Sequence, residues 1–314
     1  MIYKYLILII NIEFILYLYT YKIIIRQDQF IKTNNKKGNK SKISLQDITL
    51  VTAYYNITSK HSFNEYLNWM NNFLKINSSL VFYGEKLIIN ISKELRPKKY
   101  HNKTLWIERD MKDFYSFKNY YKEFNETFQN DCEKQRHNKL LYLIWAEKIY
   151  FLKEVVDNNV FNTKCFYWID IGYFRNPINS EFNLDFPSSE NCLEDPRVIF
   201  NSLRKFYNKE IIAFKRLDIK FYKKFIKNCN VGAGMFGGQK EYIDKFYTLY
   251  FNTIKIFIEK NFFIGKEQNI FAYIALVHPN VVKLIYSKDW FYFRKYLSPY
   301  FLKDYKIIEK SNIV

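Results

Sequence analysis

The sequence is poor in the residues that break regular structure, since its 314 residues include only 8 glycines and 6 prolines. Lys, Asn, Ile, Tyr and Phe are abundant, which suggests an AT-rich coding bias acting on an ordinary globular protein. The 4 cysteines are widely spaced and lack the close pairs of a zinc site. They permit two disulfides in an oxidising compartment or four buried thiols in a reducing one.

Blocks of like charge, internal repeats and nucleic-acid-binding motifs are also absent. The net charge is +18, but the lysines are scattered through every segment with no run of five or more like charges. This distribution is typical of a solvated surface and argues against a groove for nucleic acid. With 48% hydrophobic residues, the chain can bury a sizeable core and suits one large domain.

The N-terminal residues predict a membrane anchor. The segment from Tyr3 to Ile25 is almost wholly apolar and long enough to cross a bilayer, although it contains Asn11, Glu13 and Lys22. It lacks the small-residue cleavage site of a secretory signal. We therefore predict an uncleaved signal anchor over 1–26, with a buried amphipathic helix as the alternative.

Residues 27–46 have no apolar periodicity and predict a polar stem, which leaves 47–314 as the folded domain. Basic residues after the anchor would keep this domain in the cytoplasm by the positive-inside rule. Asn-X-Ser/Thr triplets would instead suit glycosylation in a lumen. They begin at Asn56, Asn77, Asn90, Asn102 and Asn125. The orientation stays open, and the expected localisation is a single-pass membrane protein of the Golgi or ER lumen in a eukaryote, or of the inner membrane in a bacterium.

The folded domain shows alternating strand and helix patterns. Strands are predicted over 47–55 and 79–83, with an amphipathic helix between them. Further helices are predicted over 139–156, 239–260 and 266–276, and further strands over 165–170 and 210–215. The order strand, helix, strand predicts an α/β fold with a mainly parallel sheet flanked by helices. Such sheets bind ligands at the carboxyl ends of their strands.

One carboxylate, Asp170, ends the β-prone apolar run that starts at Cys165, and Gly172 and Arg175 follow it. Burying an unpaired carboxylate is costly unless a cation receives it. Asp170 is therefore either bonded to backbone amides in a tight turn or a ligand of Mg²⁺ or Mn²⁺ beside a diphosphate. In the second interpretation, Arg175 adds positive potential.

Half of the glycines lie in one short segment, at Gly232, Gly234, Gly237 and Gly238. This segment could be a mobile loop. It could also be a wall that approaches a flat ligand such as a sugar ring, because apolar residues lie between the glycines. It matches neither the dinucleotide fingerprint nor the phosphate-cradling lysine motif.

Three polar residues near the C-terminal end complete the candidate site. Glu267 is either an acid favoured in the first turn of a helix or a general base that deprotonates an acceptor hydroxyl. Gln268 would then orient the transferred group. His278 is either a core or turn histidine or a metal ligand.

The order of several short motifs resembles that of the HtrL/YibB (WlaTC) family. The motifs span about 48–296 and are Val51 to Tyr54, Tyr66 with Trp69, Trp145 to Lys148, Trp168 to Gly172, Gly232 to Gly238, and Lys266 to Gln268. The family is similar to glycosyltransferases with a GT-A-like nucleotide-sugar-binding fold.

The resemblance implies sugar transfer from a nucleotide-sugar donor to a glycan or lipid-linked acceptor, assisted by Mn²⁺ or Mg²⁺ at Asp170. The expected substrate-binding residues are Thr52, Ala53, Tyr54, Lys148, Trp168, Gly172, Arg175, Gly232, Gly234, Gly237 and Gly238. Many GT-A enzymes have a second acid where this chain has Gly172, and the family pattern has Asp where this chain has Glu267. The alternative is a non-catalytic, membrane-anchored protein of the same fold that binds glycans or a partner.

Overall fold

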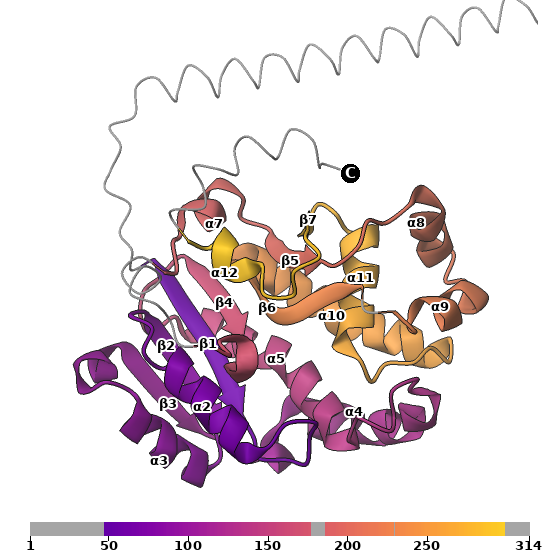
Figure 1. The fold of residues 1–314 in the computed structure, drawn as a ribbon. Helices are drawn as coiled ribbons and strands as arrows, with labels where there is room; N and C mark the ends of the chain where they lie inside the picture. Colours follow the sequence, from indigo (N-terminus) through magenta and orange to yellow (C-terminus); the bar gives the residue numbers. More distant parts are fainter. Residues whose placement is uncertain (1–46, 177–185, 229, 299–314) are drawn as a thin grey trace, which may run out of the picture. The chain divides into compact units, whose positions relative to one another are not determined.

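The computed structural model describes residues 47–176, 186–228 and 230–298 (Figure 1). The predicted anchor and stem, residues 1–46, lie outside this part of the chain. No helix within the described ranges is long and apolar enough to cross a membrane. This finding contradicts the predicted single-pass membrane localisation, which had rested on segment 1–26.

Within the described residues, seven strands form one sheet in the order β3-β2-β1-β4-β6-β5-β7. The strands are β1 (Ile48–Tyr54), β2 (Ser79–Gly84), β3 (Thr104–Glu108), β4 (Cys165–Ile169), β5 (Val198–Ser202), β6 (Val231–Gln239) and β7 (Val282–Tyr286). β6 is antiparallel to both neighbours, β4 and β5, while the other neighbouring pairs are parallel. The predicted α/β class with a mainly parallel sheet is confirmed.

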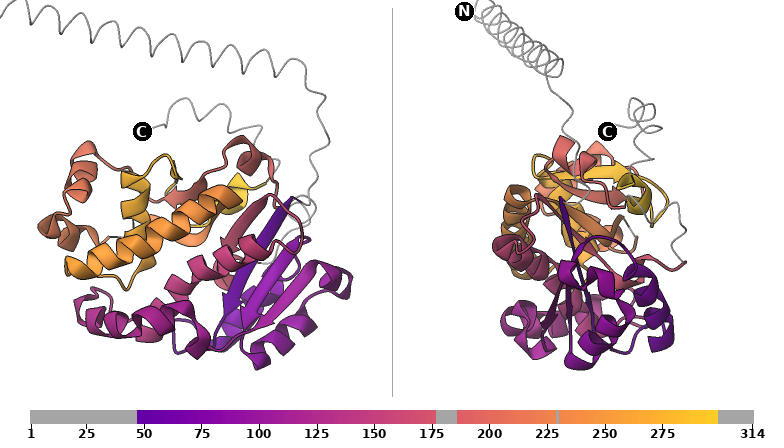
Figure 2. Two further views of the ribbon diagram at one scale, coloured as in Figure 1. Left: turned by 180° about the vertical axis from the view of Figure 1, so that it is seen from behind. Right: turned by 90° about the vertical axis from the view of Figure 1, so that its left-hand side faces the viewer.

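Helices cover both faces of this sheet, as Figures 1 and 2 show. They are α2 (Phe63–Phe73), α3 (Lys86–Leu95), α4 (Tyr115–Thr127), α5 (Lys139–Asn158), α7 (Glu190–Glu194), α8 (Asn208–Lys215), α9 (Ile219–Phe225), α10 (Lys240–Glu259), α11 (Glu267–Val277) and α12 (Phe293–Tyr296). Successive side chains of a strand point to opposite faces, so Leu50 and Val51 of β1 belong to different cores. One core lies under α4, α5, α10 and α11, and the other under α2, α3 and α12.

Local sequence explains where the two helices that frame the candidate site begin. Ser62 caps α2 in a capping box. Its side-chain oxygen accepts a hydrogen bond from the backbone N–H of Glu65, and its own backbone N–H donates to the Glu65 carboxylate. The side chain of Asn138 accepts a hydrogen bond from the backbone N–H of Leu140 and caps α5. α5 ends at Asn158, and the capping residue Asn159 has a left-handed backbone.

Two predicted elements differ from the structure. The glycine-rich segment, for which a mobile loop was one interpretation, is the buried strand β6. Residues 210–215, predicted as a strand, lie in helix α8. Glu210 is the reason, because its carboxylate accepts a hydrogen bond from the backbone N–H of Tyr207 and also pairs with Arg204. These contacts stabilise the first turn of a helix more than β-branched residues favour a strand.

One disulfide is present among the described cysteines. It joins Cys165, at the start of β4, to Cys192 in α7. Cys132 is exposed and free. Cys229 lies outside the described residues, so a second disulfide is not assigned.

Glu147 of α5 gives the stability of this domain an expected pH dependence. Its fully buried carboxylate accepts hydrogen bonds from the backbone N–H groups of Tyr115 and Ser116, which open α4. Burial raises the pKa of Glu147 to about 7, while the hydrogen bonds from Ser116 and Tyr115 and the charge of Arg109 oppose the rise. Because the folded pKa lies above the unfolded value, the stability contributed by the protonated form is complete below pH 4.5 and is lost as the pH rises through about 7.

We therefore expect the Glu147→Gln variant to lose less stability than the wild type between pH 5 and pH 8. The difference between the two should be on the order of 3 kcal/mol at most. Urea unfolding at both pH values measures it, with Glu259→Gln, at an exposed position of α10, as the control for loss of a surface charge. A wild type and a Glu147→Gln variant with parallel pH profiles would show that Glu147 ionises normally.

Candidate functional site

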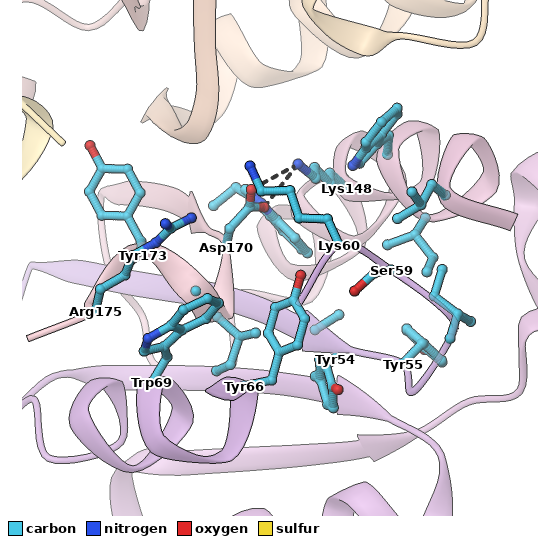
Figure 3. A pocket seen from close by; sticks show the side chains of 18 of the residues that line it. Tyr54, Tyr55, Ser59, Lys60, Tyr66, Trp69, Lys148, Asp170, Tyr173 and Arg175 are labelled. Atoms are coloured by element: carbon cyan, nitrogen blue, oxygen red, sulfur yellow. Dashed lines mark hydrogen bonds and ion pairs between the residues drawn. The ribbon is translucent and has the colours of Figure 1, made fainter. Parts of the chain in front are cut away.

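A cavity of about 440 Å³ lies at the carboxyl ends of β1 and β4 (Figure 3). The loop after β1, the turn after β4, one face of α2 and one face of α5 form its walls. Residues 290 and 291 close it from the C-terminal part of the chain. The lining residues are Ala53, Tyr54, Tyr55, Ile57, Ser59, Lys60, Tyr66, Trp69, Leu141, Ile144, Trp145, Lys148, Trp168, Asp170, Ile171, Gly172, Tyr173, Arg175, Trp290 and Phe291.

The face of α5 that lines the cavity follows from helical spacing. Leu141, Ile144, Trp145 and Lys148 recur at intervals of three and four residues, which places them on one side of a helix. The residue that this spacing brings deepest into the site is Lys148, whose side chain is only 3% exposed.

An ion-pair cluster connects the cavity to the protein interior. The Lys148 ammonium lies 2.9 Å from Oδ1 of Asp170 and 3.0 Å from Oε1 of Glu267. The Asp170 side chain is 37% exposed and faces the cavity, whereas that of Glu267 is 4% exposed. The indole N–H of Trp168 also donates to Oδ1 of Asp170 at 2.7 Å. The two carboxylates thus share one buried ammonium group.

This arrangement keeps Lys148 charged. Burial lowers the pKa of its ammonium, but the charges and hydrogen bonds of Asp170 and Glu267 raise the pKa by a larger amount, so the net change is upward. Burial raises the pKa of Glu267, and Lys148 opposes that rise. Removing the Lys148 ammonium would leave the buried Glu267 carboxylate without its counter-ion, which is strongly unfavourable.

Aromatic rings and a second cation form the opposite wall, visible in Figure 3. The Arg175 guanidinium lies 4.7 Å from the centroid of the Trp69 ring and 5.4 Å from that of Phe291. Tyr66 packs edge-on against Trp69 with their centroids 5.1 Å apart. Such cation–π contacts orient a guanidinium and leave its N–H groups available as donors.

Two glycines make room for these rings. A Cβ on Gly172 would lie 3.0 Å from the Trp69 ring, and a Cβ on Gly234 would lie 3.0 Å from the Tyr173 ring. Gly232, Gly237 and Gly238 contact other parts of the sheet and its connections instead. None of the four β6 glycines lines the cavity.

The structure brings together about half of the residues predicted for the site. Those lining the cavity are Ala53, Tyr54, Lys148, Trp168, Asp170, Gly172 and Arg175. Thr52 instead donates a hydrogen bond to the carbonyl of Ile169 at 2.7 Å and ties β1 to β4. Glu267 and Gln268 are buried in α11 outside the cavity lining.

His278, predicted as a possible metal ligand, does not line the cavity. It follows the last residue of α11, while Glu267 begins that helix. A helix of this length spans about 16 Å. Burial lowers the pKa of His278, which fits a core histidine rather than a partner of Asp170.

Several lining residues were not predicted as site residues from the sequence. Lys60 follows β1 and Tyr173 follows β4, so their positions after strands that end at the site could have indicated them. Trp290 and Phe291 have no comparable local signal, because they reach the cavity from more than 100 residues farther along the chain.

The residues of the cavity do not fit a resident divalent cation. Within the described ranges, no group of three or more His, Cys, Asp or Glu side chains could hold a metal ion. Asp170 is the sole carboxylate among the lining residues, and the Lys148 ammonium already contacts it. A metal ion would therefore compete with an existing cation for one carboxylate.

The fold and site define an α/β protein with a ligand-sized pocket of cations and aromatic rings at the carboxyl edge of its sheet. Residues 46–298 match the family described as "Bacterial protein of unknown function (HtrL_YibB)". The chain belongs to this family, which confirms the resemblance of its motifs. A search of curated proteins finds no match.

Proposed function

We propose that this protein is a glycosyltransferase that transfers a sugar from a nucleotide-sugar donor to a hydroxyl group of a glycan or similar acceptor. The observation that carries the proposal is the position of Asp170, which directly follows β4 and faces a cavity that also contains Arg175 and aromatic rings. Ligands of open α/β sheets bind at this edge. A GT-A-like arrangement of the nucleotide and sugar is part of the proposal.

The chemistry of the lining residues supports an anionic, sugar-containing ligand. Of the charged residues that line the cavity, three are cationic, Lys60, Lys148 and Arg175, and one is acidic, Asp170. The two cations that make no ion pair with a described residue, Arg175 and Lys60, would bind phosphate oxygens and stabilise the charge on the departing diphosphate. The rings of Tyr66 and Trp69 offer flat apolar surfaces to a base or a sugar ring.

Asp170 is the acidic group best placed to act on the acceptor. A general base must come within hydrogen-bonding reach of the proton that it removes, and Glu267 does not line the cavity. Lys148 and Trp168 both donate hydrogen bonds to Asp170 and hold its carboxylate in one orientation. In this scheme Asp170 takes the proton from the acceptor hydroxyl as its oxygen attacks the sugar, and the nucleoside diphosphate leaves.

The first test is a thermal-shift panel with UDP-, GDP-, CMP- and ADP-sugars, because a ligand of the folded state raises its apparent stability. Stabilisation by one nucleotide class, followed by transfer to an acceptor detected by mass spectrometry, is the expected result. Stabilisation by none of them would contradict the proposal. Binding without transfer or donor hydrolysis would favour the non-catalytic alternative.

We expect Asp170→Asn to bind the nucleotide sugar within a few-fold of the wild type but to transfer sugar at least about 100-fold more slowly. Asparagine preserves the size of the side chain but cannot take up the proton. Asp113→Asn, at an exposed position, is the matched control. Normal turnover in Asp170→Asn would remove Asp170 from the chemical step.

A further inference from the structure

We propose that this pocket binds the diphosphate of its donor without a divalent metal, because the Lys148 ammonium already contacts Asp170 where a metal ion would bind and because Arg175 and Lys60 hold the phosphates. The inference rests on the proposed function, since it concerns the nucleoside diphosphate part of the same ligand. It replaces the cation expected from the sequence with side chains of this chain.

The geometry of Lys148 supports this inference. Its ammonium lies within 3.0 Å of carboxylate oxygens from the end of β4 and from the start of α11. This central position between two acids is where a shared metal ion would lie. The lysine is nine-tenths or more buried and extends from the middle of a 20-residue helix, so the charge is built into the fold.

Asp170 is the acid in the cavity that would otherwise repel a phosphate. Its carboxylate accepts hydrogen bonds from the ammonium of Lys148 and from the indole N–H of Trp168. Both partners offset the negative charge at the point where the diphosphate would approach. No metal is then needed to screen Asp170 from the ligand.

Two cationic side chains that line the cavity, Arg175 and Lys60, do not belong to this ion-pair cluster. Arg175 is positioned by Trp69 and Phe291, and neither it nor Lys60 makes an ion pair with any described residue. In Figure 3, Lys60 and Arg175 extend from opposite walls on either side of Asp170. A planar guanidinium can bind phosphate oxygens through two parallel hydrogen bonds, and an ammonium supplies a compact second charge.

The deciding experiment measures binding of UDP, GDP and ADP to the wild-type protein by calorimetry, in EDTA and in Mn²⁺. We expect one of them to bind with an affinity that differs by no more than about 3-fold between the two conditions, since no ligand–metal bond contributes. Binding that requires Mn²⁺ would overturn this inference and leave the proposed function standing. Binding of none of them in either condition would overturn this inference, and the proposed function would also fall if the CMP-sugar of the thermal-shift panel did not bind.

Arg175→Ala tests the phosphate-binding cations at a position that is exposed and therefore tolerant of substitution. We expect nucleoside diphosphate affinity in EDTA to fall about 10- to 100-fold, the value of a charge-assisted bidentate contact. Arg136→Ala removes an equally exposed arginine outside the cavity and should leave affinity unchanged. Unchanged affinity in Arg175→Ala would overturn the assignment of the phosphates to this wall.

The Lys148→Met variant tests the inference by gaining a response to Mn²⁺ that the wild type lacks. Methionine keeps the apolar stem but leaves Asp170 and Glu267 facing a common space without a cation. We expect this variant to be stabilised by Mn²⁺, with a rise in melting temperature that the wild type does not show. Lys139→Met, at an exposed position of the same helix, is the control. A wild type that Mn²⁺ stabilises as much as Lys148→Met would contradict the proposal.

Discussion

Gly237→Ala is expected to abolish stable folding of the domain. A Cβ at this position would lie 2.0 Å from the carbonyl oxygen of Phe166 and 2.7 Å from the Cα of Tyr167. Both atoms belong to the backbone of β4, which pairs with β6 in the middle of the sheet and cannot rotate away. We expect a loss of at least about 4 kcal/mol in the free energy of unfolding, a value reached only by severe core defects.

Gly232→Ala, in the same strand, is the matched control. Its nearest neighbours would be side-chain atoms of Asn201 at 3.5 and 3.6 Å, which are ordinary contacts. We expect a change within about 1 kcal/mol. Soluble yield and urea unfolding compare the two variants, and equal stability would show that β4 and β6 are not paired in this register.

The double substitution of Cys165 and Cys192 by alanine is expected to have the second largest effect. The disulfide links residues 27 positions apart. Loop-closure entropy for that length corresponds to on the order of 3–4 kcal/mol of stability. The bond also ties β4, which leads into Asp170, to α7 on the chain that follows. Urea unfolding of the oxidised wild type and the double variant measures the difference.

Two controls separate the disulfide from other effects of cysteine. Cys132→Ala removes an exposed thiol and should leave the unfolding midpoint within experimental error. Treating the wild type with a reductant should lower its midpoint toward that of the double variant. An unfolding midpoint that does not respond to reduction would show that the two sulfurs are not joined.

The sequence predicted the elements whose patterns are strong and local. β1, β2 and β4 are short apolar runs, and α2, α5, α10 and α11 carry helical periodicity, so all seven were predicted within a few residues. The weaker strands β3, β5 and β7 were not. The lesson of β6 is that glycine can serve strand packing, because backbone atoms of Phe166 and Arg197 occupy the space of two absent side chains.

The candidate site was predictable only where its residues follow strand ends or family motifs. Asp170, Gly172 and Arg175 occur directly after β4, and their proximity follows from chain connectivity. The contact between Lys148 and Glu267 joins residues 119 positions apart and depends on how α11 packs beside α5. No local pattern encodes that packing, so the sequence offered Glu267 as a first-turn acid or a general base but not as a buried counter-ion of Lys148.

The position of β6 also determines when the sheet can fold during synthesis on the ribosome. β6 lies between β4 and β5 in the sheet but follows both along the chain. Until β6 has been synthesised, one edge of β4 is unpaired. The ion pair between Lys148 and Glu267 can form only later, when α11 has been synthesised. A nascent chain that has passed Asp170 therefore exposes a template for wrong pairing, and its pocket can form only after most of the protein has been made.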